Sequence, residues 1–179
     1  MSAETSKGKA IWIIGSKADE KLVIPGIAIH EYLGIPYDLR VSSAHKTPRN
    51  VLDIISRYNT RKDPTVYLAC VGGSPALGGM VAVHARFPTI SVPLEEKYLQ
   101  EMLLAAAVNA SGVAPLVSIN VKNAALSSAI ILGMSNAEIE ERTNAYRKTF
   151  PDTVRQDDPV VRRGIRKNVL EYLVEHPIK

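Results

Sequence analysis

The apolar residues of this chain fall into short runs that alternate with longer stretches of helical spacing. Five short runs, most of them rich in β-branched residues, predict strands. These runs are residues 10–14, 37–41, 65–71, 89–92 and 116–120. Residues 10–14 and 65–71 are almost continuously apolar, which is typical of strands buried on both faces of a parallel sheet.

Between and after these runs, apolar residues recur every three or four positions, which predicts helices. The predicted helices are residues 19–33, 49–58, 76–85, 95–108, 122–132, 136–149 and 160–174. Pro25 predicts that the first helix either begins near it or is kinked there. Ser135 or Asn136 is expected to cap the helix that follows them. The polar, proline-bearing segment 150–159 is expected to be a linker.

Strands that alternate with helices predict one parallel sheet covered by helices on both faces. Residues 10–135 are therefore expected to form one α/β domain, preceded by a tail at 1–9 and followed by a helical extension at 136–179. Right-handed crossovers bring the carboxyl ends of all strands to one edge of the sheet. Ligands of α/β proteins bind outside that edge, so the loops that follow the strands are the candidate site.

Composition narrows the class of partner. The 179 residues are 46% hydrophobic and carry a net charge of only +4, with the basic excess mainly in the last third. Basic residues on terminal helices are more often a solvated face than a nucleic-acid site, so we expect no nucleic-acid partner. The single Cys70 excludes an intramolecular disulfide, and no apolar stretch approaches a membrane span. Because residues 1–8 are polar, no signal peptide is predicted, and a cytoplasmic protein is expected.

The loop after residues 37–41 carries the most specific chemistry. Ser42 and Ser43 supply hydroxyls, His45 an imidazole and Lys46 an ammonium group, directly before a predicted helix. Backbone amides at a helix start, together with serine and lysine, suit a phosphate group. Histidine is the side chain best suited to proton transfer near neutral pH. This loop therefore predicts both an anion site and an acid/base group.

Other strand-end loops are expected to meet this one. Gly15, Ser16 and Asp19 follow the first strand, where Ser16 suits a phosphate and Asp19 suits ribose hydroxyls, although an ordinary helix cap is the simpler interpretation of that segment alone. Gly72-Gly73-Ser74 follows the third strand; it either lets backbone approach a ligand or forms a plain turn. It lacks the Gly-Lys-Ser/Thr of a P-loop. Pro93-Leu94 is expected at the same edge.

The remaining histidines and the cysteine predict no further site. His30 and His84 fall within predicted helices and His176 lies near the end of the chain, so each is expected to be structural or solvent-facing. None has the i, i+4 spacing of a metal-binding pair, and no metal site is predicted. Cys70 is expected to be a small core residue rather than a nucleophile.

Four segments carry a family resemblance: IIGSKAD at 13–19, GIPYDLRVSSAHKTP at 34–48, GGSPALGGMVA at 72–82 and VKNAALSSAIILG at 121–133. In these segments the sequence resembles the aminoimidazole ribonucleotide carboxylase/mutase (PurE-like) family of purine biosynthesis. The resemblance implies a flavodoxin-like three-layer α/β/α sandwich. It also implies a homotetramer or homo-octamer with sites at subunit boundaries, and chemistry without metal, ATP, biotin or another cofactor.

The resemblance also implies roles for the loop residues. Ser16, Ser43 and Lys46 would bind the substrate phosphate and Asp19 the ribose, with Gly15 and Ser42 in the same substrate-binding set. His45 would move the proton at the ring carbon that is carboxylated. The loop of Gly72, Gly73 and Ser74 would border the carboxylate or carbon dioxide. The partners implied are a small ribonucleotide and carbon dioxide.

Two branches of the family differ in their signatures, and this sequence combines them. The mutase branch has an arginine after the loop histidine and a second histidine in the Gly-rich loop, where this chain has Lys46 and Ala76. Lys46, the segment 110–112 and the extended C-terminus resemble the direct carboxylase. Gly79-Met80 and the paired glycines before Ser74 resemble the mutase.

Direct carboxylation of the aminoimidazole ribonucleotide is therefore preferred. Three alternatives remain open: the mutase reaction on the N-carboxylated nucleotide, a carboxylase acting on another nucleotide, as in nickel-pincer cofactor synthesis, and a non-catalytic nucleotide-binding paralogue.

Overall fold

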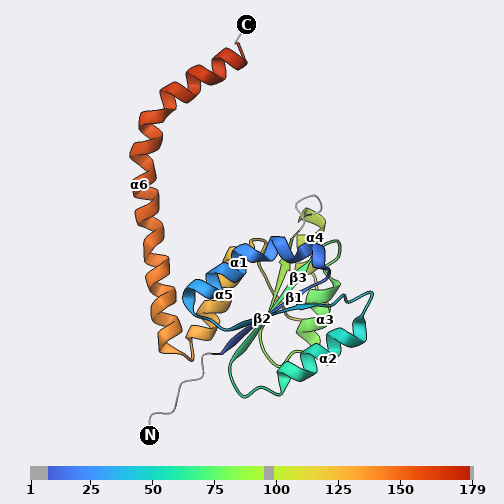
Figure 1. Cartoon of the computed structure of the whole chain (residues 1–179). Coiled ribbons are helices and arrows are strands. Elements are labelled where there is room, and N and C mark those ends of the chain that lie inside the picture. The colour runs from blue at the N-terminus through green and yellow to red at the C-terminus, as the bar shows by residue number, and fades with distance from the viewer. Residues whose placement is uncertain (1–7, 95–98, 178–179) are drawn as a thin grey trace. The chain divides into compact units, whose positions relative to one another are not determined.

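The computed structural model describes residues 8–94 and 99–177, and its first layer is a five-stranded parallel sheet (Figure 1). The strands are β1 (Lys9–Ile14), β2 (Tyr37–Val41), β3 (Thr65–Val71), β4 (Thr89–Pro93) and β5 (Leu116–Val117). Their order in the sheet is β2-β1-β3-β4-β5, and each neighbouring pair is parallel. The predicted parallel, flavodoxin-like sheet is confirmed.

Helices cover the sheet on both sides. They are η1 (Lys17–Asp19, a 3-10 turn), α1 (Glu20–Leu33), α2 (Pro48–Asn59), α3 (Ala76–His84), α4 (Leu99–Ala107), α5 (Val121–Gly133) and α6 (Ala137–Glu175). Figure 1 shows α1 beside α5 on one face of the sheet and α2 beside α3 on the other. Of the predicted helix 95–108, the described residues contain α4 (Leu99–Ala107), and residues 95–98 lie outside the described residues.

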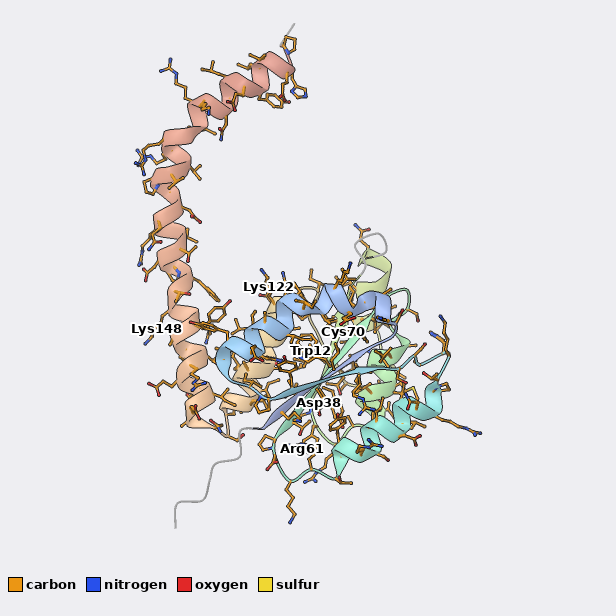
Figure 2. All side chains as sticks on the ribbon, viewed as in Figure 1. Trp12, Asp38, Arg61, Cys70, Lys122 and Lys148 are labelled. Atoms are coloured by element: carbon orange, nitrogen blue, oxygen red, sulfur yellow. The ribbon has the colours of Figure 1, made fainter. Side chains whose placement is uncertain are left out.

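Alternation along β1 distributes its side chains between two cores. Ile11 and Ile13 pack with buried residues of α2, α3 and β3, among them Ile55 of α2 and Val81 of α3. Trp12 points to the opposite face, where it contacts His30 of α1 (Figure 2). Because every residue of β3 is buried, the near-continuous apolar runs reflect a sheet covered on both faces.

The face covered by α1 and α5 contains a buried polar network. Trp12 Nε1 donates to His30 Nδ1 at 3.0 Å, so the proton of the neutral imidazole is on Nε2. That nitrogen lies 2.7 Å from Ser128 Oγ and 3.1 Å from the carbonyl oxygen of Ala125. The network joins β1, α1 and α5, and it confirms the structural role predicted for His30.

The structure decides two predictions about where helices begin. α1 begins at Glu20 and contains Pro25, so the alternative that it begins near the proline is wrong. Asn136 caps α6, because its Oδ1 accepts the backbone N–H of Ile139 at 3.0 Å.

The predicted linker at 150–159 is wrong, because α6 runs through it as one helix. Pro151 and Pro159 each remove one backbone donor. Side chains also bond to backbone carbonyl groups in this stretch: Arg163 Nε donates to the Pro159 carbonyl oxygen at 2.9 Å, and Thr153 Oγ1 donates to the Thr149 carbonyl oxygen at 3.1 Å. Ion pairs three or four residues apart, such as Arg155 with Asp152, add further support.

The chain divides into two compact units, residues 1–143 and 144–179. The first unit includes the start of α6, where Ile139 and Thr143 are buried. The described part of the second unit is the rest of that helix and its C-terminal end. Within the described residues, no helix combines the length and the apolar character that crossing a membrane requires.

The fifth strand ends earlier than predicted, at Val117 instead of residue 120. Asn120 instead caps α5, because its side-chain oxygen accepts the backbone N–H groups of Lys122 and Asn123. Asn120 keeps extended backbone, but its side chain is used to cap α5, so the residues after Val117 lead into that helix instead of extending the strand.

Candidate active site

A cavity of about 440 Å³ opens at the carboxyl edge of the sheet. Its walls come from the three loops that follow β1, β2 and β3, which is where the strand order changes direction around β1. The lining residues are Gly15, Ser16, Ala18, Asp19, Ser43, Ala44, His45, Cys70, Val71, Gly72, Gly73, Ser74 and Leu77. Eight of the ten predicted site residues therefore meet in one cavity: Gly15, Ser16, Asp19, Ser43, His45, Gly72, Gly73 and Ser74.

The loop after β1 is closed by a reciprocal capping box. Ser16 Oγ accepts the backbone N–H of Ala18 at 3.2 Å, and the backbone N–H of Ser16 donates to Asp19 Oδ2 at 2.9 Å. The simpler interpretation, a helix cap, is thus correct for the local contacts. Asp19 is only partly exposed and still lines the cavity, so one of its carboxylate oxygens holds the loop while the group faces the site.

The loop after β2 is held by the hydroxyl of Thr47. Thr47 Oγ1 accepts the backbone N–H of Ser43 at 2.9 Å and lies 3.0 Å from Ser42 Oγ. The backbone N–H of Thr47 donates to the Ser43 carbonyl oxygen at 2.9 Å. These bonds fold the loop back on itself and present Ser43, Ala44 and His45 to the cavity. Sequence reasoning missed this role of Thr47, although a Ser/Thr before a helix is a known turn signal.

Two predicted site residues do not line the cavity. Ser42 is buried, and its hydroxyl accepts a hydrogen bond from Asn50 Nδ2 at 3.0 Å besides its contact with Thr47, so it supports the loop from beneath. Lys46 is exposed, and its backbone N–H donates to Ser43 Oγ at 3.2 Å. The prediction placed both residues by their position in the loop, which does not determine where each side chain points.

The loop after β3 forms the remaining wall. Gly73 is exposed, and a Cβ atom added to it would meet nothing within 4 Å. Cys70 contributes to the floor, but it is fully buried, and burial followed by the charge of Asp19 raises the pKa of its thiol. A thiol held in its neutral form is a poor nucleophile, so this environment supports the predicted structural role.

The fourth strand-end loop lies elsewhere. Pro93 and Leu94 line a separate groove of about 310 Å³ with Leu22, Pro25 and residues 119–122. The expectation that this loop joins the other three is therefore wrong. β4 lies beyond β3 in the sheet, so its loop is displaced from the point between β1 and β3 where the cavity opens.

Within the described residues, His45 is the one histidine that lines the cavity. His30 is buried against Trp12, His84 ends α3 on the surface, and His176 lies at the end of α6 beside Tyr172. The described residues contain no group of three or more His, Cys, Asp or Glu side chains placed to hold a metal ion.

Comparison with known proteins identifies the family. A family model described as AIR carboxylase matches residues 9–153. The chain belongs to the AIR carboxylase family. The model spans the whole sheet and its cavity-forming loops, and it ends inside α6. The resemblance inferred from the sequence is confirmed.

Individual members of the AIR carboxylase family carry two kinds of name. A probable N5-carboxyaminoimidazole ribonucleotide mutase of Methanothermobacter thermautotrophicus is 32% identical over 162 residues, covering 89% of this chain. The chain spans only 48% of that relative. A phosphoribosylaminoimidazole carboxylase of Archaeoglobus fulgidus is 33% identical, with 78% of this chain and 77% of the relative covered.

A solved structure of an AIR carboxylase family member supports the fold. The crystal structure of Treponema denticola PurE superposes with a TM-score of 0.81 at 26% sequence identity. It covers 86% of this chain and 98% of the PurE chain.

Proposed function

We propose that this chain carboxylates 5-aminoimidazole ribonucleotide with carbon dioxide, giving 4-carboxy-5-aminoimidazole ribonucleotide for purine biosynthesis. The observation that carries the proposal is the position of His45. It lines a polar cavity together with Ser43, Ser16 and Asp19, in a chain of the AIR carboxylase family. An acid/base group thus lies beside hydroxyl and carboxylate groups suited to a ribonucleotide.

The reaction needs one carbon–carbon bond and one proton transfer. The ring carbon, made electron-rich by the neighbouring amine, attacks the carbon of carbon dioxide, and one C=O electron pair moves to oxygen to form a carboxylate. The attacked carbon then carries both the carboxylate and its original hydrogen. His45 accepts that proton, the C–H electrons restore the aromatic ring, and the imidazolium releases the proton to solvent.

The remaining lining residues hold the nucleotide. The loop hydroxyls of Ser16 and Ser43 suit the phosphate, and Lys46 extends from the same loop to supply positive charge. Asp19 suits ribose hydroxyls, because a carboxylate accepts hydrogen bonds from them. Gly72 and Gly73 leave room for the carboxylate, and Ser74 offers it a donor; with no side chains on either glycine, ligand atoms approach the backbone closely.

The mutase reaction is the alternative, and relatives of both names match this chain. A Pyrococcus horikoshii protein named as the mutase is 33% identical over 149 residues. The residue that favours direct carboxylation is Ala76, which stands where the mutase branch is expected to carry its second loop histidine. Ala76 begins α3 and is not among the lining residues described for the cavity. A methyl group offers no proton to a migrating carboxyl group.

An isotope experiment separates the two reactions. The N-carboxylated nucleotide is labelled with ¹³C in its carboxyl group and supplied with excess unlabelled bicarbonate, over times shorter than its spontaneous breakdown. A direct carboxylase leaves the N-carboxylated nucleotide unused over this time, whereas in a second arm it converts added aminoimidazole ribonucleotide into product with unlabelled carbon and saturates with carbon dioxide. Product that retains the ¹³C would establish carboxyl transfer and replace our proposal with the mutase.

A second measurement tests whether the chain is a catalyst at all. His45→Asn should abolish turnover of the aminoimidazole ribonucleotide while its binding changes little, and His84→Asn serves as the surface control. General acid/base groups contribute about a hundred- to ten-thousand-fold in rate. Wild-type binding without turnover in either isotope arm would identify a non-catalytic nucleotide-binding paralogue. We further propose a cytoplasmic homotetramer or homo-octamer, as the family resemblance implies.

A further inference from the structure

The loop that carries His45 is a single closed turn. The backbone N–H of Thr47 donates to the Ser43 carbonyl oxygen at 2.9 Å, and this bond encloses the three residues between them. The Thr47 side chain braces the same turn, because its Oγ1 accepts the Ser43 N–H at 2.9 Å and donates to the Ser43 carbonyl oxygen at 3.3 Å. His45 lies in the middle of this turn, so the position of its imidazole depends on how Ser43 and Thr47 are held.

Ser42 attaches the base of the turn to the sheet. Its backbone N–H donates to the carbonyl oxygen of Ile14, the last residue of β1, at 2.9 Å. Its hydroxyl lies 3.0 Å from Thr47 Oγ1 and 3.4 Å from the Thr47 carbonyl oxygen. Ser42 is only 3% exposed, so its hydroxyl depends on protein partners. A further partner is Asn50 of α2, whose Nδ2 donates to Ser42 Oγ at 3.0 Å.

The Asn50 amide fixes the direction in which the Ser42 hydroxyl donates. The NH₂ group of an amide is a donor only, so Ser42 Oγ accepts from Asn50 and its single proton is left for Thr47. Ser42 therefore donates to the residue that closes the turn. An acceptor at position 50 would instead draw the Ser42 proton toward α2, and Thr47 would lose that hydrogen bond.

The same contacts leave α2 without its usual cap. Thr47 is the N-cap residue of α2 and Asn50 its third residue, and side chains at these two positions normally satisfy the free N–H groups of a helix start. Within the described residues, Thr47 makes no side-chain cap hydrogen bond, and both side chains contact the loop instead. In α5, by contrast, Asn120 accepts the N–H groups of Lys122 and Asn123. Natural proteins break such local rules at functional sites.

We propose that Asn50 is a positioning residue for the loop that carries His45, acting through Ser42 and Thr47. Asn50 is not among the lining residues described for the cavity, so it has no role as a direct ligand of the substrate. The catalytic consequence rests on the proposed function, because it needs His45 to transfer the proton. The hydrogen-bond chain itself can be tested without turnover.

Asn50→Asp and Asn50→Leu test the direction of this contact. Leucine has the branched shape of asparagine without a donor, and a carboxylate accepts where the amide donates. In both variants kcat for the aminoimidazole ribonucleotide should fall about tenfold, because small misplacements of a catalytic group are costly. KM should change less, since Thr47 still closes the turn on Ser43.

Stability separates this role from a merely structural one. Aspartate is favourable in the first turn of a helix, so Asn50→Asp should unfold in urea at the wild-type midpoint or above it. Asn123→Leu is the matched control, because Asn123 is exposed and is likewise the third residue of its helix. It should keep the wild-type kcat. Unchanged kcat in Asn50→Asp, or a fall in kcat that only accompanies a loss of stability, would overturn the proposal.

A double-mutant cycle tests whether Asn50 acts through Ser42. In a Ser42→Ala background, Asn50→Leu should leave kcat unchanged, because the contact that it removes is already absent. Independent losses of kcat from the two substitutions would rule out this route.

Hydrogen-exchange mass spectrometry of the peptide covering residues 42–47 tests the loop without the proposed reaction. Exchange in Asn50→Leu should be about fivefold faster than in the wild type or Asn123→Leu, the effect of losing one hydrogen bond. Faster exchange in Asn50→Leu, beside a wild type that turns over no aminoimidazole ribonucleotide, would retain Asn50 as the positioning residue of the loop and overturn only the proposed reaction. Equal exchange in all three proteins would show that Asn50 does not hold the loop.

Discussion

Gly78 of α3 lies directly over Ser91 of β4, so close that a methyl group on the glycine would overlap the serine hydroxyl and lie 2.8 Å from Ser91 Cβ. Ser91 is fully buried, and its hydroxyl has no hydrogen-bond partner among the described residues. The contact allows α3 to sit close to the sheet. Because α3 begins directly after the Gly72–Ser74 loop, this close packing also sets the position of one wall of the cavity.

Gly78→Ala should therefore destabilise the first unit by about 1–3 kcal/mol, the usual cost of overpacking a core, although alanine favours helices. Adding Ser91→Gly should recover a large part of the loss, because it removes the atoms that the new methyl group meets. Urea unfolding of the single and double variants measures both effects. Gly73→Ala is the control, since its methyl group meets nothing within 4 Å. Equal stability of Gly78→Ala and the wild type would contradict the packing argument.

Thr47→Val should loosen the loop that carries His45. Valine keeps the shape of threonine but removes the hydroxyl that accepts the Ser43 N–H and contacts Ser42 Oγ. We expect nucleotide affinity to fall about tenfold, the equivalent of one hydrogen bond of about 1.4 kcal/mol. Thr47→Ser keeps the hydroxyl and should bind as the wild type does. Isothermal titration of nucleotide into all three proteins measures these affinities. Unchanged affinity of the Thr47→Val protein would show that the Thr47 hydroxyl does not support the binding loop.

Lys46→Ala should weaken binding of the nucleotide far more than binding of its dephosphorylated nucleoside. Charge-assisted hydrogen bonds to phosphate contribute roughly 1.5–3 kcal/mol each. Lys62→Ala, on the loop that precedes β3, is the matched control because it removes an exposed lysine far from the carboxyl edge of the sheet. Equal losses for both ligands would mean that Lys46 does not act through the phosphate.

Stability should fall with acidification through the titration of His30. Burial lowers the pKa of His30 from 6.5 to about 4, against a smaller opposing effect of its hydrogen bond with Ala125. The unfolded chain therefore binds this proton first, so stability is complete above pH 6.5 and is lost as the pH falls toward 4. The loss should be about 1.4 kcal/mol per pH unit, or about 3 kcal/mol in total.

Urea unfolding between pH 7.5 and pH 4 measures this slope. His84→Asn, at an exposed histidine, should keep the slope, and His30→Phe should remove it. The Asp38 carboxyl affects stability at a lower pH than His30 does. Burial favours its neutral form, but hydrogen bonds from Tyr58 and Lys9 and nearby positive charge outweigh this and lower its pKa. A wild-type protein whose stability does not change between pH 6.5 and pH 4 would contradict the assignment to His30.

The sheet and most of the cavity were predictable from the sequence because they follow from periodicity and topology. In a chain where strands alternate with helices, a continuous apolar run such as 65–71 forms a buried strand. Parallel strands then bring the loops that follow them to one edge of the sheet. The residues that end β1 and β3 were therefore placed correctly without any knowledge of side-chain contacts.

What failed depended on individual side chains or on lateral distance. Ser42 turns into the core through hydrogen bonds with Thr47 and Asn50, which no periodicity encodes. Lys46 is exposed and is not among the residues that line the cavity. Pro93-Leu94 lies at the correct edge but one strand too far along it. α6 continues through Pro151 and Pro159, although a proline in a helix interior usually predicts a break.

The buried position of Trp12 gives this protein a built-in optical probe. It is the one tryptophan in the chain, so its fluorescence reports the first unit and nothing beyond residue 143. Circular dichroism, in contrast, also records the long helix of residues 144–175. Comparing the two signals during one denaturation therefore resolves whether the helical extension melts with the domain or before it, without any label.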